Sequence, residues 1–170
     1  EMLREAVFGQ RVAYAEIGVS LVEPVPDLEF DCDGRMVRQA LINILKNAGE
    51  AVEARKLRGE ETAVPGISAA LVVSGGMARF IIEDDGIGLP SKDRDRLIEP
   101  YVTTREKGTV LGLAIVKRIC EDHGGDLRLD DASGLSGARV TLVFPVNQNI
   151  KSAKRSEGDG KGSVVKREAP

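Results

Sequence analysis

The sequence predicts an α+β fold, a two-layer sandwich in which a mainly antiparallel sheet has helices on one side. Two β-rich segments, residues 67–73 and 77–83, are separated by Ser-Gly-Gly at 74–76, which is typical of a β-hairpin. Two longer segments with helical periodicity, one before and one after this hairpin, supply the second layer.

The first part of the chain predicts one helix and two short strands. In residues 2–16, apolar side chains recur near helical spacing. Short strands are expected at 17–22 and 28–32, on either side of a turn that contains Pro24 and Pro26.

A long helix follows, running to about Arg58, and either Asp31 or Asp33 is placed to cap its N-terminus. One stripe of this helix is apolar and is predicted to face the core: Val37, Leu41, Ile44, Leu45, Ala48 and Val52.

The second half predicts a Gly-rich loop at 84–90 and a short helical piece at 94–98. A second long helix is expected at 111–122, where a Gly-Gly pair follows its end. Two closing strands, at 126–130 and 138–144, complete the sheet.

Residues 1–146 form the predicted domain, and 147–170 are interpreted as a disordered basic tail. The tail contains six Lys or Arg against three Asp or Glu and has few apolar residues. We interpret its charge as solvated, with a basic docking segment as the alternative.

Composition restricts the classes of protein. The net charge of -3 gives no indication of a nucleic-acid partner. The sequence contains no run of about 18 apolar residues, so we expect no membrane contact by this domain. Cys32 and Cys120 have no CxxC partner and suit a reducing cytosol, so we expect a cytoplasmic domain. Because the chain starts at Glu1, we expect a fragment of a parent whose membrane status is open.

Asn43 and Asn47 stand one turn apart on a helix stripe away from the core face. Asn is a mediocre helix former, so a stacked pair needs a reason. A solvated face or a bond to a neighbouring loop is one reason. The other is that amide oxygens are hard ligands of the kind that Mg²⁺ prefers.

Two glycine-containing segments suit a nucleotide. In the loop at 84–88, glycines permit a flat ligand to approach the backbone, and Asp84 could accept a hydrogen bond from an exocyclic amine such as adenine N6. Residues 108–113 lead into a helix whose N-terminal amides could bind phosphate, with Arg105 and Lys107 just before them. Each segment alone also suits an ordinary turn. Neither a Walker A loop nor a GxGxxG motif is present.

Together these pieces resemble the GHKL family of ATPases and kinases and, within it, the sensor histidine kinases. Residues 43–48 look like the N box, 84–88 like the G1 box, 99–105 like the F box and 108–113 like the G2 box. The stretch 112–125 is similar to nitrogen-regulation sensor kinases of the NtrY type.

The resemblance, which covers about residues 3–146, implies a Bergerat fold, a mixed sheet backed by helices with ATP between helices and lid. It implies that Asn47 binds Mg²⁺ with Asn43 beside it, that Asp84 binds adenine, and that Gly86 and Gly88 let the base approach. It places a further group near the phosphates: Arg105, Lys107, Gly108, Thr109, Leu111, Gly112 and Leu113. The implied partners are a dimerisation and histidine-phosphotransfer domain of the same kinase and a response regulator.

Three positions depart from the family. Val110 stands where the family usually has Gly, and a β-branched residue resists positive φ and adds bulk near the phosphates. Some members have Lys and an aromatic residue where this chain has Glu50 and Ala51.

His123, the one histidine, ends the second long helix, where a helix C-terminus favours a protonated imidazole. We therefore predict a structural role for it. In the family the phosphate-accepting histidine lies upstream on a two-helix element, and this chain contains no such helices.

The leading hypothesis is a histidine-kinase catalytic domain that donates the ATP γ-phosphoryl group to that missing histidine. A GHL-type ATPase is disfavoured because its water-activating Glu would stand where this chain has Asn43. A regulatory nucleotide-binding module with impaired catalysis is the third hypothesis, and Val110 supports it.

Overall fold

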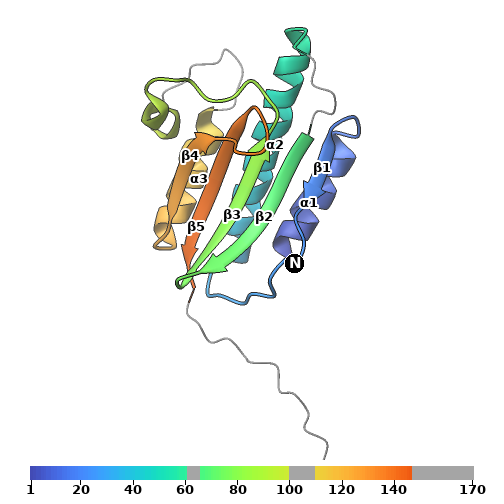
Figure 1. Ribbon diagram of the computed structural model, residues 1–170. Helices are drawn as coiled ribbons and strands as arrows, with labels where there is room; N and C mark the ends of the chain where they lie inside the picture. The colour runs from blue at the N-terminus through green and yellow to red at the C-terminus, as the bar shows by residue number, and fades with distance from the viewer. Residues whose placement is uncertain (61–65, 100–109, 147–170) are drawn as a thin grey trace, which may run out of the picture.

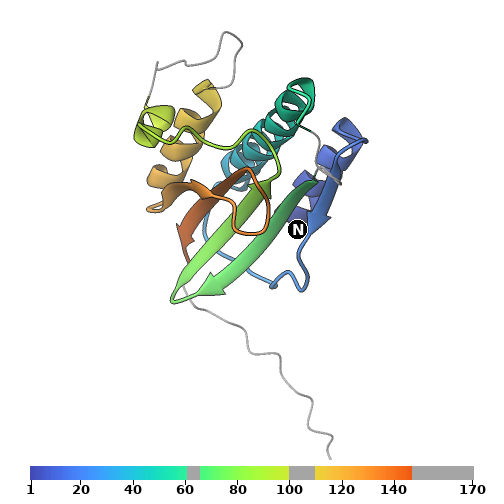
Figure 2. The same ribbon diagram turned by 45° about the horizontal axis from the view of Figure 1, so that its top comes forward.

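The computed structural model describes residues 1–60, 66–99 and 110–146, with side chains from 112 onward in the last range. Within these ranges a five-stranded sheet has the order β1-β2-β3-β5-β4 and carries helices α1, α2 and α3 on one face (Figures 1 and 2). The elements are α1 (Met2–Ala13), β1 (Gly18–Leu21), α2 (Gly34–Leu57), β2 (Gly66–Ser74), β3 (Met77–Asp84), the 3₁₀ helix η1 (Arg94–Ile98), α3 (Val110–Asp122), β4 (Asp126–Asp131) and β5 (Ala138–Pro145). This confirms the predicted α+β sandwich.

The sheet is mixed but mainly antiparallel. Strand β1 is parallel to β2, whereas the β2–β3, β3–β5 and β4–β5 pairs are antiparallel. The predicted hairpin forms between β2 and β3, with Gly75 and Gly76 at φ values of 58° and 71°. Glycine adopts such positive φ angles without the steric penalty of a Cβ, so this pair can reverse the chain.

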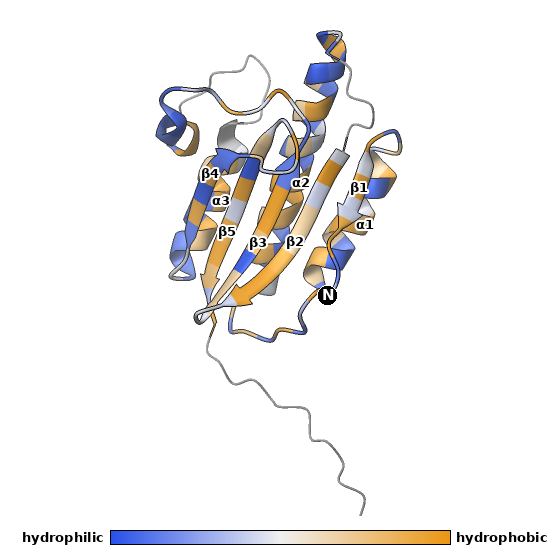
Figure 3. Cartoon of the chain, viewed as in Figure 1, coloured by the Kyte–Doolittle hydropathy of each residue, from blue (hydrophilic) through white to orange (hydrophobic). Residues whose placement is uncertain are grey.

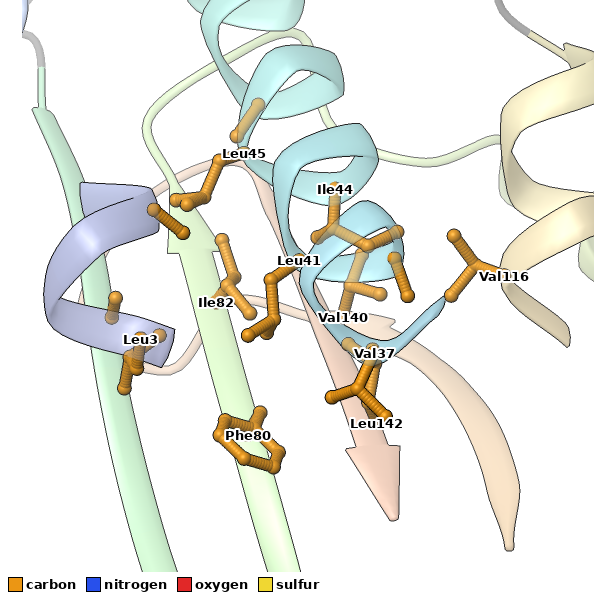
Figure 4. Packing of buried hydrophobic residues seen from close by; sticks show 14 of the residues in the cluster. Leu3, Val37, Leu41, Ile44, Leu45, Phe80, Ile82, Val116, Val140 and Leu142 are labelled. Atoms are coloured by element: carbon orange, nitrogen blue, oxygen red, sulfur yellow. The ribbon is translucent and has the colours of Figure 1, made fainter. Parts of the chain in front are cut away.

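The core lies between the helices and the sheet. Every residue of the predicted α2 stripe is buried. Figure 4 shows Leu41 and Ile44 of α2 pointing toward Ile82 of β3 and Val140 of β5, with Val116 of α3 entering from the other side.

Strand β3 alternates strictly between the two faces of the sheet, because successive side chains of a strand point to opposite sides. Its core-facing residues are Ala78, Phe80, Ile82 and Asp84. Figure 3 shows the apolar colouring along the strands of the sheet. Asp84 therefore continues the apolar row and carries a carboxylate to its end.

Residues 28–32 do not form the predicted strand. Among the described residues the sheet ends at β1 on one side and at β4 on the other, and the segment 28–32 pairs with neither edge strand. Its apolar side chains pack against the core as a loop instead, and the ring of Phe30 lies 5.8 Å from that of Phe144.

The boundaries of the two long helices are now fixed. Asp33, rather than Asp31, caps α2, because its carboxylate accepts hydrogen bonds from the Arg35 and Met36 amides. Helix α3 begins at Val110, one residue earlier than predicted. Val110 is thus the first residue of this helix, and its effect on ATP binding stays a prediction. None of the described helices has the length and apolar content that a membrane span requires.

Candidate nucleotide-binding site

A cavity of about 120 Å³ opens between α2, α3 and the ends of β3 and β5. Most of its lining residues are apolar, and the polar side chains among them are those of Asn47 and Asp84. Its lining residues are Ile44, Asn47, Ala48, Ala51, Ile82, Asp84, Gly88, Leu89, Pro90, Leu97, Leu113, Ala138 and Val140. A concave, mainly apolar site with a small number of oriented polar groups is typical of small-molecule binding.

Asp84 supplies the carboxylate of the cavity and is itself 4% exposed. Its Oδ1 accepts hydrogen bonds from the backbone amides of Gly86, at 2.9 Å, and Ala138, at 3.2 Å. The main chain thus fixes the direction in which Asp84 faces the cavity.

Two glycines permit this arrangement by close packing. A Cβ on Gly86 would lie 2.6 Å from the Cβ of Ala51, so Gly86 lets the loop rest against α2. A Cβ on Gly137 would lie 2.5 Å from the Asp84 carbonyl oxygen and 2.6 Å from the Gly86 nitrogen. Sequence reasoning missed Gly137; its position in the Gly- and Ser-rich turn before β5 was the available signal.

Gly88 lies in the cavity wall with φ at 72°, a conformation that favours glycine. Gly86 is absent from the cavity lining and packs behind it. The two glycines expected to admit a flat ligand therefore have different positions, one at the cavity and one at the helix behind.

Asn47 also lines the cavity, and its amide lies near the first turn of α3. A Cβ built on Gly112 would lie 3.7 Å from Nδ2 and 3.8 Å from Oδ1 of Asn47. Asn43 does not line the cavity: its Oδ1 accepts a hydrogen bond of 2.9 Å from the Gln39 amide. The structure thus brings Asn47, but not Asn43, together with Asp84.

The residues expected near phosphate divide into two groups. Arg105, Lys107, Gly108 and Thr109 lie outside the described residues. Leu111, Gly112 and Leu113 belong to the first turns of α3, and the Leu113 side chain lines the cavity.

A buried ion pair supports the loop from behind and was not predicted. Arg55 of α2 donates to the Asp85 carboxylate at 3.0 Å, and the two side chains are only 19% and 7% exposed. The Ser136 amide donates to the same Asp85 oxygen at 3.3 Å. The sequence signal was an arginine at the end of α2 together with the second Asp of the loop.

His123 lies away from the cavity lining and connects the two long helices. Its Nε2 accepts a hydrogen bond of 2.9 Å from the Asp33 amide, and its Nδ1 lies 2.7 Å from the Ile119 carbonyl oxygen. Both ring nitrogens thus contact the main chain, one at the start of α2 and one within α3, which supports the predicted structural role of His123.

Three comparisons relate this chain to known proteins. A family model of histidine kinase-, DNA gyrase B- and HSP90-like ATPases matches residues 32–148. The nitrogen regulation protein NtrY of Azorhizobium caulinodans is 45% identical over 149 residues, covering 85% of this chain and 18% of that protein. The mycobacterial sensor histidine kinase MprB has a similar structure, with a TM-score of 0.70 and 25% identity over 86% of this chain and 93% of that chain.

Full-length ShkA in complex with AMPPNP is a further structural neighbour. It has a TM-score of 0.68 and 26% identity, covering 85% of this chain and 29% of that chain. The chain spans about a fifth of the length of the curated relatives it matches.

Proposed function

Since the chain belongs to the family of histidine kinase-, DNA gyrase B- and HSP90-like ATPases, we propose that it is the ATP-binding catalytic domain of a two-component sensor histidine kinase. In this proposal the domain holds ATP and donates its γ-phosphoryl group to a histidine on a dimerisation domain of the same kinase. A response regulator then receives the phosphoryl group. The names of the relatives, among them NtrY, support this choice within the family.

One observation carries the proposal: Asp84 and Asn47 both line one mainly apolar cavity. The Asp84 carboxylate accepts a hydrogen bond from the N6 amine of adenine, and apolar side chains such as Ile82 and Val140 contact the faces of the base. This orientation directs the phosphates toward Asn47 and the N-terminal turn of α3, where backbone amides favour negative charge.

Mg²⁺ fits the same end of the cavity. Among the described residues no cluster of three or more His, Cys, Asp or Glu side chains could hold a metal. Mg²⁺ commonly keeps several waters and takes few protein oxygens in addition to substrate phosphates, so one amide oxygen from Asn47 suits it. Bound there, Mg²⁺ would neutralise phosphate charge. Asn43 does not line the cavity, and its Oδ1 accepts a hydrogen bond from the Gln39 side chain, so its predicted role beside Mg²⁺ stays a prediction.

Phosphoryl transfer to a histidine, rather than hydrolysis, suits the residues on α2. Hydrolysis needs a group that activates water, and the position one turn before Asn47 carries Asn43, whose amide is no base. Transfer to a positioned acceptor requires mainly orientation and charge neutralisation, which this cavity supplies.

The test is the substitution Asp84→Asn, which keeps an oxygen for the Gly86 and Ala138 amides but presents an NH₂ group to the adenine amine. We expect ATP affinity to fall by about 1–3 kcal/mol, the range for leaving a buried polar group without its partner. Calorimetric titration with ATP, with and without Mg²⁺, measures the change.

Asp130→Asn, an exposed substitution on β4, is the matched control and should bind ATP as the parent does. GTP should compete poorly with ATP in the parent chain, because guanine has a carbonyl where adenine has the amine. If Asp84→Asn binds ATP as tightly as the parent, Asp84 is not the adenine ligand.

A further inference from the structure

The Arg55–Asp85 ion pair is less exposed than most ion pairs among the described residues, with side chains that are 19% and 7% exposed. The guanidinium Nη1 contacts Oδ1 of Asp85 at 3.0 Å and the Asp85 carbonyl oxygen at 3.3 Å. By contrast, the Arg38–Glu5 pair between α2 and α1 has side chains that are 50% and 46% exposed. A buried charge pair is costly to desolvate, so its presence beside the cavity calls for a role other than general stability.

The pair joins three segments of the chain at one point. Arg55 belongs to the last turns of α2, and Asp85 is the first residue after β3. The Ser136 amide, from the turn before β5, donates to the same Asp85 oxygen that Arg55 contacts. The carboxylate of Asp85 thus holds the turn before β5 and the loop after β3 against α2.

The same two segments supply the donors that orient Asp84. Gly86, next to Asp85, and Ala138, two residues after Ser136, donate to Oδ1 of Asp84. The loop is fixed to α2 a second time where the Ile87 amide donates to the Ala51 carbonyl oxygen at 3.2 Å. Any displacement of Asp85 therefore moves the donors that set the direction of the Asp84 carboxylate.

We propose that Arg55 and Asp85 are positioning residues for adenine recognition: by holding the loop after β3 and the turn before β5 on α2, they fix the direction of Asp84. This inference rests on the proposed function, in which Asp84 accepts the adenine amine. Neither residue lines the cavity, so their effect on the ligand passes through Asp84.

Two variants test the proposal in the 170-residue chain. Arg55→Lys keeps the charge and the aliphatic stem but loses the planar guanidinium that reaches two oxygens of Asp85. Asp85→Asn keeps an oxygen for the Ser136 amide but removes the charge that binds Arg55. Arg38→Lys is the matched control, because it makes the same change in an exposed ion pair of the same helix.

The measurement is the affinity for ADP and for GDP by calorimetry, with thermal unfolding followed in parallel. We expect ADP affinity to fall by about two- to 150-fold in both variants, the range for residues coupled in one network, and the ADP:GDP affinity ratio to fall with it. The change in ADP affinity on adding Mg²⁺ should stay as in the parent, because the phosphate end is untouched. Arg38→Lys should leave all three quantities unchanged.

A purely structural role would lower the unfolding temperature without changing the ADP:GDP ratio of the folded protein, and that result overturns the proposal. If Asp85→Asn fails to fold, Arg55→Lys carries the test, and amide hydrogen exchange at Ala138 gives a second readout. An unchanged exchange rate together with an unchanged ADP:GDP ratio would also overturn it. If the parent chain binds neither ADP nor GDP, the proposed function is wrong. If the parent binds ADP and both variants keep its ADP affinity and ADP:GDP affinity ratio, only this inference is wrong.

Discussion

At the scale of single residues, the surroundings of Asp84 depend on a glycine that lies 53 positions further along the chain. Gly137 donates its amide to the Asp84 carbonyl oxygen at 3.0 Å, and the space beside its Cα is filled by Asp84 and Gly86. A Cβ built on Gly134, in the same turn, would have no atom within 4 Å. The two glycines therefore differ in their packing although they share a turn.

Gly137→Ala should displace Asp84, because its Cβ would lie 2.6 Å from the Gly86 nitrogen and backbone cannot yield as a flexible side chain does. We expect a loss of about 1–3 kcal/mol in the free energy of unfolding, the usual range for overpacking, together with weaker ATP binding. Denaturant unfolding and calorimetry measure both. Gly134→Ala is the control and should change neither, and equal behaviour of the two variants would contradict the packing described here.

At the scale of elements, α1 packs on α2 at Gly49, close to the Asn47 turn. A Cβ on Gly49 would lie 2.8 Å from Gln10 Nε2 and 2.8 Å from the Tyr14 ring, so only a glycine lets the helices approach this closely. Gln10 is buried, and its amide donates to the Leu45 carbonyl oxygen at 2.8 Å. This buried hydrogen bond joins α1 to α2 at their contact.

Gly49→Ala should destabilise the chain by about 1 kcal/mol or more, because the crowding of Gln10 and Tyr14 outweighs the better helix propensity of Ala. Gly9→Ala, in α1, should instead stabilise it by about 0.5–1 kcal/mol, since Gly9 is exposed and has open space around its Cα. Urea unfolding of the two variants measures both signs. Stabilisation by both substitutions would show that α1 and α2 do not approach at Gly49.

The contact between α3 and β4 depends on pH through Lys117 and Asp126. A 2.6 Å hydrogen bond from Lys117 holds the pKa of the Asp126 carboxyl below its ordinary value, and the same bond raises the pKa of Lys117. For Asp126 the stabilisation is complete above the unfolded pKa of about 3.9 and is lost as pH falls through the lower folded value. For Lys117 it is complete below about 10.4 and is lost as pH rises through the higher folded value.

Asp126→Asn should therefore lower the free energy of unfolding at pH 7, and the difference from the parent should shrink as the pH is lowered from 5 to about 3. The side chains are 25% and 47% exposed, so solvent screening limits the difference to about 1 kcal/mol or less. Denaturant unfolding at several pH values measures it. Asp130→Asn, for which the described residues provide no ion pair, is the control, and a difference that persists at pH 3 would contradict the role of the pair.

At the scale of the whole molecule, we expect the chain by itself to acquire no phosphohistidine from radiolabelled ATP. Both ring nitrogens of His123 are engaged, one by the Asp33 amide and one by the Ile119 carbonyl oxygen, and the ring packs edge-on against Phe144. In-line transfer needs reacting atoms about 3–3.5 Å apart, and the side chain of His123 lies outside the cavity lining.

Acid-labile labelling after incubation with ATP is the measurement, with His123→Gln as the control. Addition of a two-helix dimerisation segment that carries an accepting histidine, separately or fused before Glu1, should produce labelling. Labelling of the chain alone that disappears in His123→Gln would contradict both the structural role of His123 and the proposed function as a donor domain.

The sequence by itself determined the elements and the order of the boxes. The 3.6-residue period of α2, the Ser-Gly-Gly turn and the paired glycines after α3 act over a few residues, so each can be identified without knowing the fold. The same local signals placed Asp84 at a strand end and Asn47 on a helix stripe away from the core stripe. The strand expected at 28–32 does not form. A strand needs another strand to pair with, and that pairing depends on the arrangement of the whole sheet, which a local pattern does not show.

Only the tertiary structure decided which residues meet at the site. It placed Asn47, but not Asn43, in the cavity, brought Gly137 against Asp84 and joined Arg55 to Asp85. It also brought the His123 ring to the Asp33 amide, which belongs to a residue 90 positions away. These contacts join segments far apart in the chain, and close packing and the satisfaction of buried polar groups fix them only after the sheet and helices have assembled.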